Sequence, residues 1–275
     1  MSSTDRRPVH VGGEVLASRA SGGLVHLSVL APGIGERFRP GTAVAVSIGP
    51  PVSRSRLARR SFWIHEVKPV GGRGLALGLV VEPRGAGSRW LAEAPVGTPL
   101  ELTGPLGRPF ALPQEPVACL LVAEEYAAAP IFPLALRLRE RGCAVTLLLG
   151  ARDEAHLMSA LEARRSARAV TVVTGDGSVG RAGRTADALP EVLASSGAEV
   201  VYAAGPTPLL HAVAAAAEDH GAWSQVALEV PSPCATGLCF GCQVPVVGEA
   251  GSPRSARACV DGPVLRGDRV RWADL

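Results

Sequence analysis

Long apolar runs are missing from this 275-residue sequence, and so is any strong excess of charge of one sign. The uncharged run at 200–217 is interrupted by Gly205, Pro206 and Pro208, whereas a membrane span needs about 20 predominantly apolar residues. The first ten residues lack the apolar core of a secretory signal. The 28 basic and 25 acidic residues are spread along the chain, which is not the pattern of a nucleic-acid-binding surface. We therefore expect a cytoplasmic protein with no membrane or nucleic-acid partner.

Common hydrolytic sites are also missing. The six histidines are scattered, and none is spaced with carboxylates as metal ligands are. No nucleophile-elbow serine is present, and the Gly-rich stretch 174–183 lacks the Lys-Ser/Thr of a phosphate-binding P-loop. We expect no hydrolase activity and no complete catalytic site in this chain alone, which leaves open whether it is an enzyme by itself.

The composition favours a folded chain of about two domains, with 47% hydrophobic and 19% charged residues. Residues 1–111 contain short apolar segments separated by Gly and Pro, which indicate an antiparallel barrel or sandwich. The predicted strands in this part are 23–30, 43–48, 61–67 and 75–81, with helical periodicity only around 88–94.

The middle of the chain, 112–225, alternates predicted strands with predicted helices, which implies a parallel sheet with crossover helices. The predicted strands are 117–122, 145–149, 169–173 and 199–203, and the predicted helices are 129–141, 154–165, 185–195 and 208–220. Residues 226–275 are rich in Cys, Gly and Pro and need a covalent or metal staple. The expected fold is α+β with three parts: a flavin-reductase-like β-barrel, an α/β domain like those that bind nucleotides, and a small C-terminal iron–sulfur domain.

Four of the six cysteines lie close together near the C-terminus: Cys234, Cys239, Cys242 and Cys259. Their C-x4-C-x2-C spacing with one remote cysteine is close to that of plant-type [2Fe–2S] sites. Gly237 and Gly241 allow the loop to curl and bring backbone N–H groups near sulfur. The sequence therefore predicts that these four thiolates bind a [2Fe–2S] cluster.

Structural zinc is the main alternative for these cysteines, since it also accepts four thiolates, although usually as two paired knuckles. Free or disulfide-bonded cysteines are a further alternative, disfavoured in a reducing compartment. Cys119 and Cys143 stand alone in apolar segments and are expected to pack as small core residues.

Motifs along nearly the whole chain resemble one family, the electron-transfer subunits of class 1B dihydroorotate dehydrogenase, within the ferredoxin-reductase-like superfamily. Besides the four cysteines, the matching segments are 60–64 (RSFWI), 104–107 (GPLG), 174–180 (TGDGSVG), 202–206 (YAAGP), 225–229 (QVALE) and 259–264 (CVDGPV). The resemblance implies an FAD-binding barrel, an NAD-binding α/β domain and a C-terminal [2Fe–2S] loop. It also implies a flavoprotein partner with a TIM-barrel fold.

The resemblance places the FAD site on two segments. Its Arg-Pro-aromatic/aliphatic-Ser run corresponds to 60–63 and its Gly-x-Gly-Thr run to 85–88, so the expected cofactor-binding residues are Arg60, Ser61, Phe62, Trp63, Gly87 and Ser88. Two positions depart from the pattern, since Ser61 replaces proline and Trp63 stands where a serine is expected. A bulky indole at that position either stacks on the flavin or blocks it. Taken alone, 85–88 also fits an ordinary Gly turn with a Ser cap.

The nicotinamide site departs further from the family pattern. A Gly-rich run is expected after the first α/β strand, but Glu124, Glu125 and Tyr126 follow it here, before Ala129 and Pro130. A like-charge contact at ~4 Å with an effective dielectric of about 20 costs about 4 kcal/mol before screening. We therefore expect NAD(P)H binding to be impaired. The alternative interpretation of these residues is an ordinary packed strand–loop–helix with a solvated acidic pair.

Three functional hypotheses remain. The first is an electron-transfer subunit that relays electrons to or from a flavoprotein partner through the cluster and FAD. The second is a non-catalytic docking subunit with closed flavin and nucleotide sites. The third is a conventional NADH-dependent reductase subunit.

Overall fold

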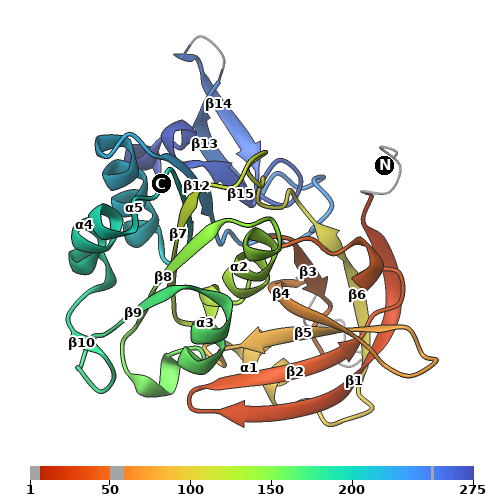
Figure 1. The fold of residues 1–275 in the computed structure, drawn as a ribbon. Helices are drawn as coiled ribbons and strands as arrows, with labels where there is room; N and C mark the ends of the chain where they lie inside the picture. The colour runs from red at the N-terminus through yellow and green to blue at the C-terminus, as the bar shows by residue number, and fades with distance from the viewer. Residues whose placement is uncertain (1–6, 50–58, 249–250) are drawn as a thin grey trace.

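The N-terminal part is a closed antiparallel barrel (Figure 1). The computed structural model describes residues 7–49, 59–248 and 251–275. Residues 1–6, which are part of the segment expected not to be a secretory signal, lie outside the described residues. The barrel strands run in the order β1-β2-β5-β4-β3-β6. Their bounds are β1 (Val9–Ser21), β2 (Leu24–Leu30), β3 (Ala43–Val46), β4 (Arg60–Pro69), β5 (Leu75–Val81) and β6 (Pro99–Leu106). A short helix, α1 (Ala86–Ala92), connects β5 to β6.

Strand β4 has its two faces in two different cores, as period-two alternation requires. Phe62 and Ile64 pack into the barrel interior. Trp63 points the other way, into a cluster that includes Phe132 of the α/β part. The same strand therefore closes the barrel and joins it to its neighbour.

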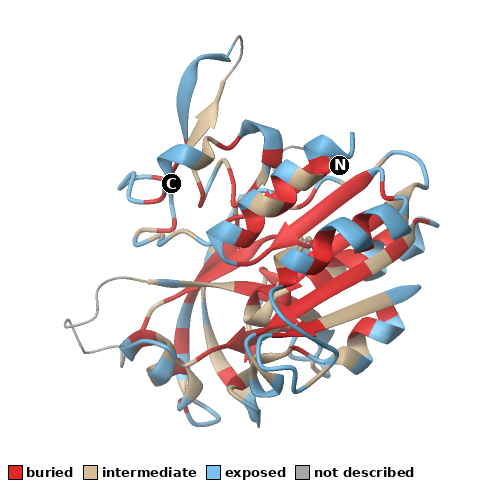
Figure 2. Ribbon diagram, turned by 90° about the vertical axis from the view of Figure 1, so that its left-hand side faces the viewer, coloured by how far each residue is buried: buried red, intermediate tan, exposed pale blue. Residues whose placement is uncertain are grey.

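The second part is a twisted sheet with helices on both faces (Figures 1 and 2). Its strands run in the order β10-β9-β8-β7-β11-β12-β15. The strands are β7 (Ala118–Glu124), β8 (Ala144–Ala151), β9 (Ala169–Thr174), β10 (Arg181–Ala182), β11 (Val200–Ala204), β12 (Trp223–Ala227) and β15 (Val264–Arg266). The helices are α2 (Ile131–Glu140), α3 (Ala160–Ser166), α4 (Thr185–Ser196) and α5 (Thr207–Asp219).

Both faces of this sheet are buried, as is typical of parallel sheets. Cys119 and Leu121 of β7 pack with α2 and with barrel residues. Leu120 and Val122, on the opposite face, pack with α4 and α5. The prediction of a barrel followed by a parallel α/β sheet is confirmed, and Cys119 lies in the core as expected.

The predicted helix at 154–165 is wrong in its first half. Residues Glu154–His156 form only a 3₁₀ turn, Leu157 is extended, and α3 begins after Ser159, whose hydroxyl caps it. The Ala155 carbonyl instead accepts the N–H of Gly23 in the β1–β2 turn at 2.7 Å. A tertiary bond to the barrel thus takes the acceptor that a continuous helix would use.

The C-terminal part is a hairpin and a loop that rejoin the main sheet. The hairpin strands are β13 (Gln243–Val247) and β14 (Pro253–Arg257), and β15 pairs antiparallel with β12. The predicted limits 1–111, 112–225 and 226–275 remain predictions, and β12 spans the last of them. Within the described ranges, no helix is both long and apolar enough to cross a membrane.

A buried histidine joins the barrel to the α/β part. Nδ1 of His65, on β4, lies 3.1 Å from the Ala129 carbonyl, and its Nε2 lies 3.3 Å from a Glu162 carboxylate oxygen on α3. Burial alone would lower the pKa of His65, but the hydrogen bond and charge of Glu162 outweigh burial and raise it. Burial would likewise raise the pKa of Glu162, yet the bond to His65 lowers it. His26, Glu66 and Lys68 also act on this pair.

We expect this ion pair to make stability depend on pH. The raised pKa of His65 stabilises the fold fully below pH 6.5, and this contribution is lost as pH rises through the folded-state pKa. The lowered pKa of Glu162 stabilises it above pH 4.5, and this contribution is lost as pH falls through the folded-state pKa. Glu162→Gln should therefore lower the melting temperature most between these values, by the equivalent of about 0.5–1 kcal/mol, and less at pH 8. Thermal unfolding from pH 4.5 to 8.5 measures this, with Glu140→Gln at the exposed Arg137–Glu140 pair as control. If the Glu162→Gln variant had a melting temperature lowered by the same amount at every pH, the stabilising role of the His65–Glu162 ion pair would be contradicted.

Candidate redox site

A cavity of about 330 Å³ lies where the barrel, the loop after β7 and the C-terminal part meet. Its volume is within the range of small-molecule sites. All six residues predicted to bind the flavin line it: Arg60, Ser61, Phe62, Trp63, Gly87 and Ser88. The structure thus brings together two segments that are more than twenty residues apart in the sequence.

Strand β4 presents a hydroxyl and an indole to this cavity. The Ser61 Oγ is buried and has no hydrogen-bond partner among the described residues. An unpaired buried hydroxyl costs about 1–3 kcal/mol, so a polar atom of a bound group would relieve a penalty that the chain already carries. Trp63 is only 7% exposed, because it packs in the core between barrel and α/β part, yet it also lines the cavity. Space therefore remains beside the indole.

Arg60 and Gly87 form one wall of the cavity. A Cβ added at Gly87 would lie 3.1 Å from the Arg60 Nε, so the guanidinium packs directly on the first turn of α1. The Ser88 hydroxyl accepts the Gly85 N–H at 3.1 Å and thus caps that turn. Arg84 also lines the cavity, whereas Arg89 does not. This wall offers a cation and open backbone to an anionic group.

The cysteine loop curls by means of three residues in the left-handed region. Ala235, Gly237 and Phe240 have φ of 55°, 81° and 56°. The curl points backbone donors at sulfur, since the N–H groups of Thr236 and Cys239 both lie 3.4 Å from the Cys234 Sγ. Burial would raise the pKa of Cys234, but these two donors outweigh it and lower the pKa to about 5. The loop is thus built to hold a thiolate.

The four cysteines lie as two pairs. Cys242 and Cys259 are both buried, with their sulfurs 3.3 Å apart. Cys234 and Cys239 are linked by the backbone bond just described, and the Gly241 N–H lies 3.4 Å from the Cys239 Sγ. In the described part of the chain, no three Cys, His, Asp or Glu side chains converge as ligands of a single metal ion. A [2Fe–2S] cluster takes two thiolates on each iron, and the buried Cys242–Cys259 pair can supply one such set.

The cysteine loop and the cavity are neighbours. Cys259 lines the cavity itself. Ala235, in the loop, packs in one small apolar cluster with Ala45 and Leu106 on the outside of the barrel. A cofactor in the cavity would therefore border a ligand of the cluster.

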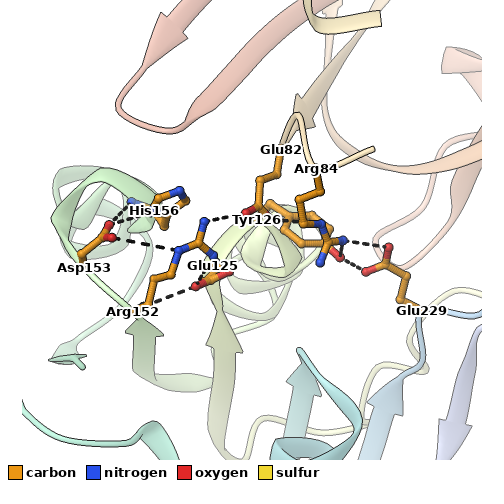
Figure 3. A network of polar contacts seen from close by, with 8 residues as sticks. All are labelled: Glu82, Arg84, Glu125, Tyr126, Arg152, Asp153, His156 and Glu229. Atoms are coloured by element: carbon orange, nitrogen blue, oxygen red, sulfur yellow. Dashed lines mark hydrogen bonds and ion pairs between the residues drawn. The ribbon is translucent and has the colours of Figure 1, made fainter. Parts of the chain in front are cut away.

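The acidic segment after β7 forms an ion-pair network with the barrel (Figure 3). Glu125 has φ of 54°, a backbone conformation that normally requires glycine. Its carboxylate lies 2.8 and 2.9 Å from Nη1 of Arg152, and the Arg152 Nη2 lies 2.7 Å from the buried Glu82 of the barrel. Burial and the charge of Glu125 raise the pKa of Glu124. The predicted solvated acidic pair is therefore wrong for Glu125, whose side chain is only 17% exposed.

Tyr126 and its partners close the next part of the same network (Figure 3). The Tyr126 ring lies 4.5 Å from the Arg84 guanidinium, and its hydroxyl donates to Glu229. Burial raises the pKa of Glu229, and the charge of Arg84 only partly offsets that effect. Tyr126, Arg84 and Glu229 all line the cavity, so the network forms its wall on the α/β side.

The sequence interpretation missed Glu82, Arg152 and Glu229 as parts of this site. Glu229 closes the matched segment 225–229, which was a usable signal. Glu82 and Arg152 are 70 residues apart and give no local pattern.

A closed six-stranded barrel, a parallel α/β sheet, a cavity at their junction and an adjoining four-cysteine loop define a ferredoxin-reductase-like electron-transfer protein. Residues 233–271 match the family model described as the iron–sulfur cluster binding domain of dihydroorotate dehydrogenase B. Over 245 residues the chain is 30% identical to the electron transfer subunit homolog of dihydroorotate dehydrogenase B (NAD(+)) from Thermotoga maritima, covering 89% of this chain and 82% of that protein. It is 31% identical over 238 residues to the electron transfer subunit from Bacillus caldolyticus, covering 86% and 88%.

Solved structures agree with this assignment. A structure described under NADH-dependent reduced ferredoxin-NADP oxidoreductase and flavin-based electron bifurcation aligns with a TM-score of 0.82 and 28% identity, covering 96% of this chain and 91% of that one. The ferredoxin reductase of carbazole 1,9a-dioxygenase aligns at 0.64 with 20% identity, covering 78% and 67%, and supports the fold alone.

The chain belongs to the family of dihydroorotate dehydrogenase B electron transfer subunits. The family predicted from the sequence motifs is thereby confirmed, together with its electron-transfer role and its iron–sulfur and flavin cofactors. The individual site residues and the impaired NAD(P)H site remain predictions.

Proposed function

We propose that this chain relays electrons between FAD in the cavity and a [2Fe–2S] cluster on Cys234, Cys239, Cys242 and Cys259. The observation that carries the proposal is the shared wall, because Cys259 borders the cavity that the six predicted flavin residues line. FAD stores electron pairs and the cluster passes single electrons, so neighbouring sites make a relay.

The chain's own residues have distinct roles in this proposal. Arg60, packed on Gly87, neutralises the FAD phosphates. The unpaired Ser61 hydroxyl supplies a hydrogen bond to the flavin ring, in place of the serine that the family pattern puts at position 63. Trp63 packs beside the ring as an apolar wall. The backbone N–H groups of Cys239 and Gly241 donate to the sulfurs of Cys234 and Cys239, respectively, and stabilise these thiolate ligands.

The other redox partner is a flavoprotein catalytic subunit of the dihydroorotate dehydrogenase B type, since the relatives are named as electron transfer subunits of that enzyme. A TIM-barrel fold for this partner and a cytoplasmic location remain expectations from the family resemblance.

This chain offers the partner a docking surface beside the cluster. Leu238 is 81% exposed, Phe240 56% and Val260 38%, and in the chain they lie next to two of the four cysteines, Cys239 and Cys259. They are three of the seven large hydrophobic side chains that are exposed among the described residues. A local group of exposed apolar side chains indicates an interaction site. A partner bound there would cover the cluster.

We expect the variant Leu238→Ser/Phe240→Ser to bind the catalytic subunit at least about tenfold more weakly, since exposed apolar anchors often contribute 1–2 kcal/mol each. Iron and flavin contents should stay unchanged. Binding is measured by titration, and function by the rate at which the dithionite-reduced chain is reoxidised on mixing with the catalytic subunit. Leu161→Ser, a 68%-exposed position on α3, is the matched control. Normal affinity in the double variant would rule out this docking surface, and failure of the unaltered chain to exchange electrons with the subunit would rule out the relay.

A further inference from the structure

The carboxyl end of β7 is where the topology of this sheet favours a dinucleotide. Strand order reverses at β7, because β8 lies on one side of it and β11 on the other. In open α/β sheets, ligands bind in the crevice at such a switch point, outside the carboxyl ends of the strands. Glu124 ends β7, and Gly205 comes directly after β11. A Cβ added at Gly205 would lie 3.5 Å from the Glu124 Cβ, so the ends of the two strands are close together. The crevice between these two loops is thus the place to look for a nicotinamide site.

The segment at this end of β7 is held by ion pairs within the chain itself. Glu125, directly after β7, has a left-handed conformation and binds Arg152, directly after β8, through both carboxylate oxygens. The second amino group of Arg152 binds Glu82 of the barrel, so that this cation is no longer available to a phosphate. Tyr126, the next residue, lines the cavity and contacts Arg84 and Glu229 (Figure 3).

The charge balance at the crevice also opposes an anionic dinucleotide. The carboxyl groups of Glu82, Glu125 and Glu229 face the guanidinium groups of Arg84 and Arg152, and Glu124 adds a fourth carboxyl group beside Glu125. Both cations are already paired. A pyrophosphate would enter a region with excess negative charge and no open cation among these residues.

Tyr126 blocks the chemistry as well as the binding. Hydride transfer needs the nicotinamide ring in near contact with the flavin ring. Tyr126 lies two residues after the end of β7 and lines the cavity, so a nicotinamide that approached the flavin from this strand end would meet its ring.

We propose that Glu125, Tyr126 and Arg152 exclude NADH and NADPH, so that this chain exchanges electrons with protein-borne redox centres instead. The inference rests on the proposed function, and it departs from the NAD(+) in the names of the relatives. A nicotinamide delivers two electrons together as hydride, whereas the cluster passes them one at a time. The reductant is therefore a reduced protein partner that gives up its two electrons in succession and releases its protons to solvent, while the reduced flavin of this chain takes up protons from solvent.

The test uses the full chain loaded with cluster and FAD under anaerobic conditions. NADH and NADPH at millimolar concentration should leave the flavin and cluster absorbance unchanged. Dithionite, and the catalytic subunit reduced with dihydroorotate, should both bleach it. Titration with ADP-ribose, which has no hydride to give, measures occupancy of the crevice independently of redox activity. Bleaching of the unaltered chain by NADH or NADPH at a rate close to that with dithionite would overturn the inference.

A variant with smaller side chains after β7 provides the complementary experiment. Glu125→Gly keeps the left-handed backbone without strain, and Tyr126→Ala opens the path to the cavity, while Arg152 retains Glu82. The double variant should bind ADP-ribose at least about tenfold more tightly than the unaltered chain, a gain of about 1.4 kcal/mol. Glu191→Gln, at the exposed Arg181–Glu191 pair, should change nothing.

The outcomes separate the two proposals. A double variant that retains its flavin yet binds ADP-ribose no better would overturn the role assigned to these residues. A chain that takes up no FAD at all would instead refute the proposed relay, which the flavin content of each sample shows directly.

Discussion

Cys239→Ala is expected to remove the iron–sulfur absorption bands and to reduce electron exchange with the catalytic subunit by at least about a hundredfold. Cys239 is exposed, so its loss leaves the core intact while the cluster loses one of four ligands. Iron content, visible absorption and stopped-flow electron transfer measure the effect on one preparation. FAD content should be close to that of the unaltered chain, because Cys239 does not line the cavity.

Cys143→Ala is the matched control for this cysteine. Cys143 is buried in the core that contains α2, away from the loop. It should retain iron and electron transfer. A Cys239→Ala variant with normal iron and normal rates would show that a different set of ligands holds the metal.

Arg60→Gln is expected to raise the dissociation constant for FAD by about 10–100-fold. The change removes a cation that lines the cavity, and a hydrogen bond to a charged group contributes about 1.5–3 kcal/mol. The cluster should remain, since Arg60 is on β4 and not in the cysteine loop. Flavin fluorescence during titration of the flavin-free protein with FAD measures the affinity.

Arg89→Gln provides the comparison for Arg60. Arg89 is exposed on α1 and does not line the cavity, so its replacement should change FAD affinity less than about twofold. Equal weakening in both variants would point to general loss of positive charge rather than to a specific phosphate contact.

Local patterns predicted much of the fold. The alternation 61–67 marked β4, and the apolar run 117–122 marked β7, because burial on one or both faces of a sheet leaves a direct trace in the sequence. The 154–165 helix failed because its periodicity continues through a turn whose carbonyl binds Gly23 of the barrel. A contact across more than 130 residues leaves no local trace.

In the candidate site, too, local sequence patterns predicted some residues, whereas contacts between distant parts of the chain were not predictable. The cysteine spacing was sufficient to name the four thiols, and the 60–63 and 85–88 segments named six residues of the cavity. The interaction of Glu125 with Arg152 and Glu82 was not predictable, because it depends on how two parts of the chain pack together. The left-handed conformation of Glu125 was equally hidden, since glutamate rarely adopts it.

The most direct test of the relay is chemical analysis of anaerobically purified protein, with iron, acid-labile sulfide, zinc and flavin determined on one sample after incubation with FAD. The account predicts about two irons, about two sulfides and about one FAD per chain, with no zinc. Zinc in place of iron, or iron with no flavin even after FAD is supplied, would contradict it.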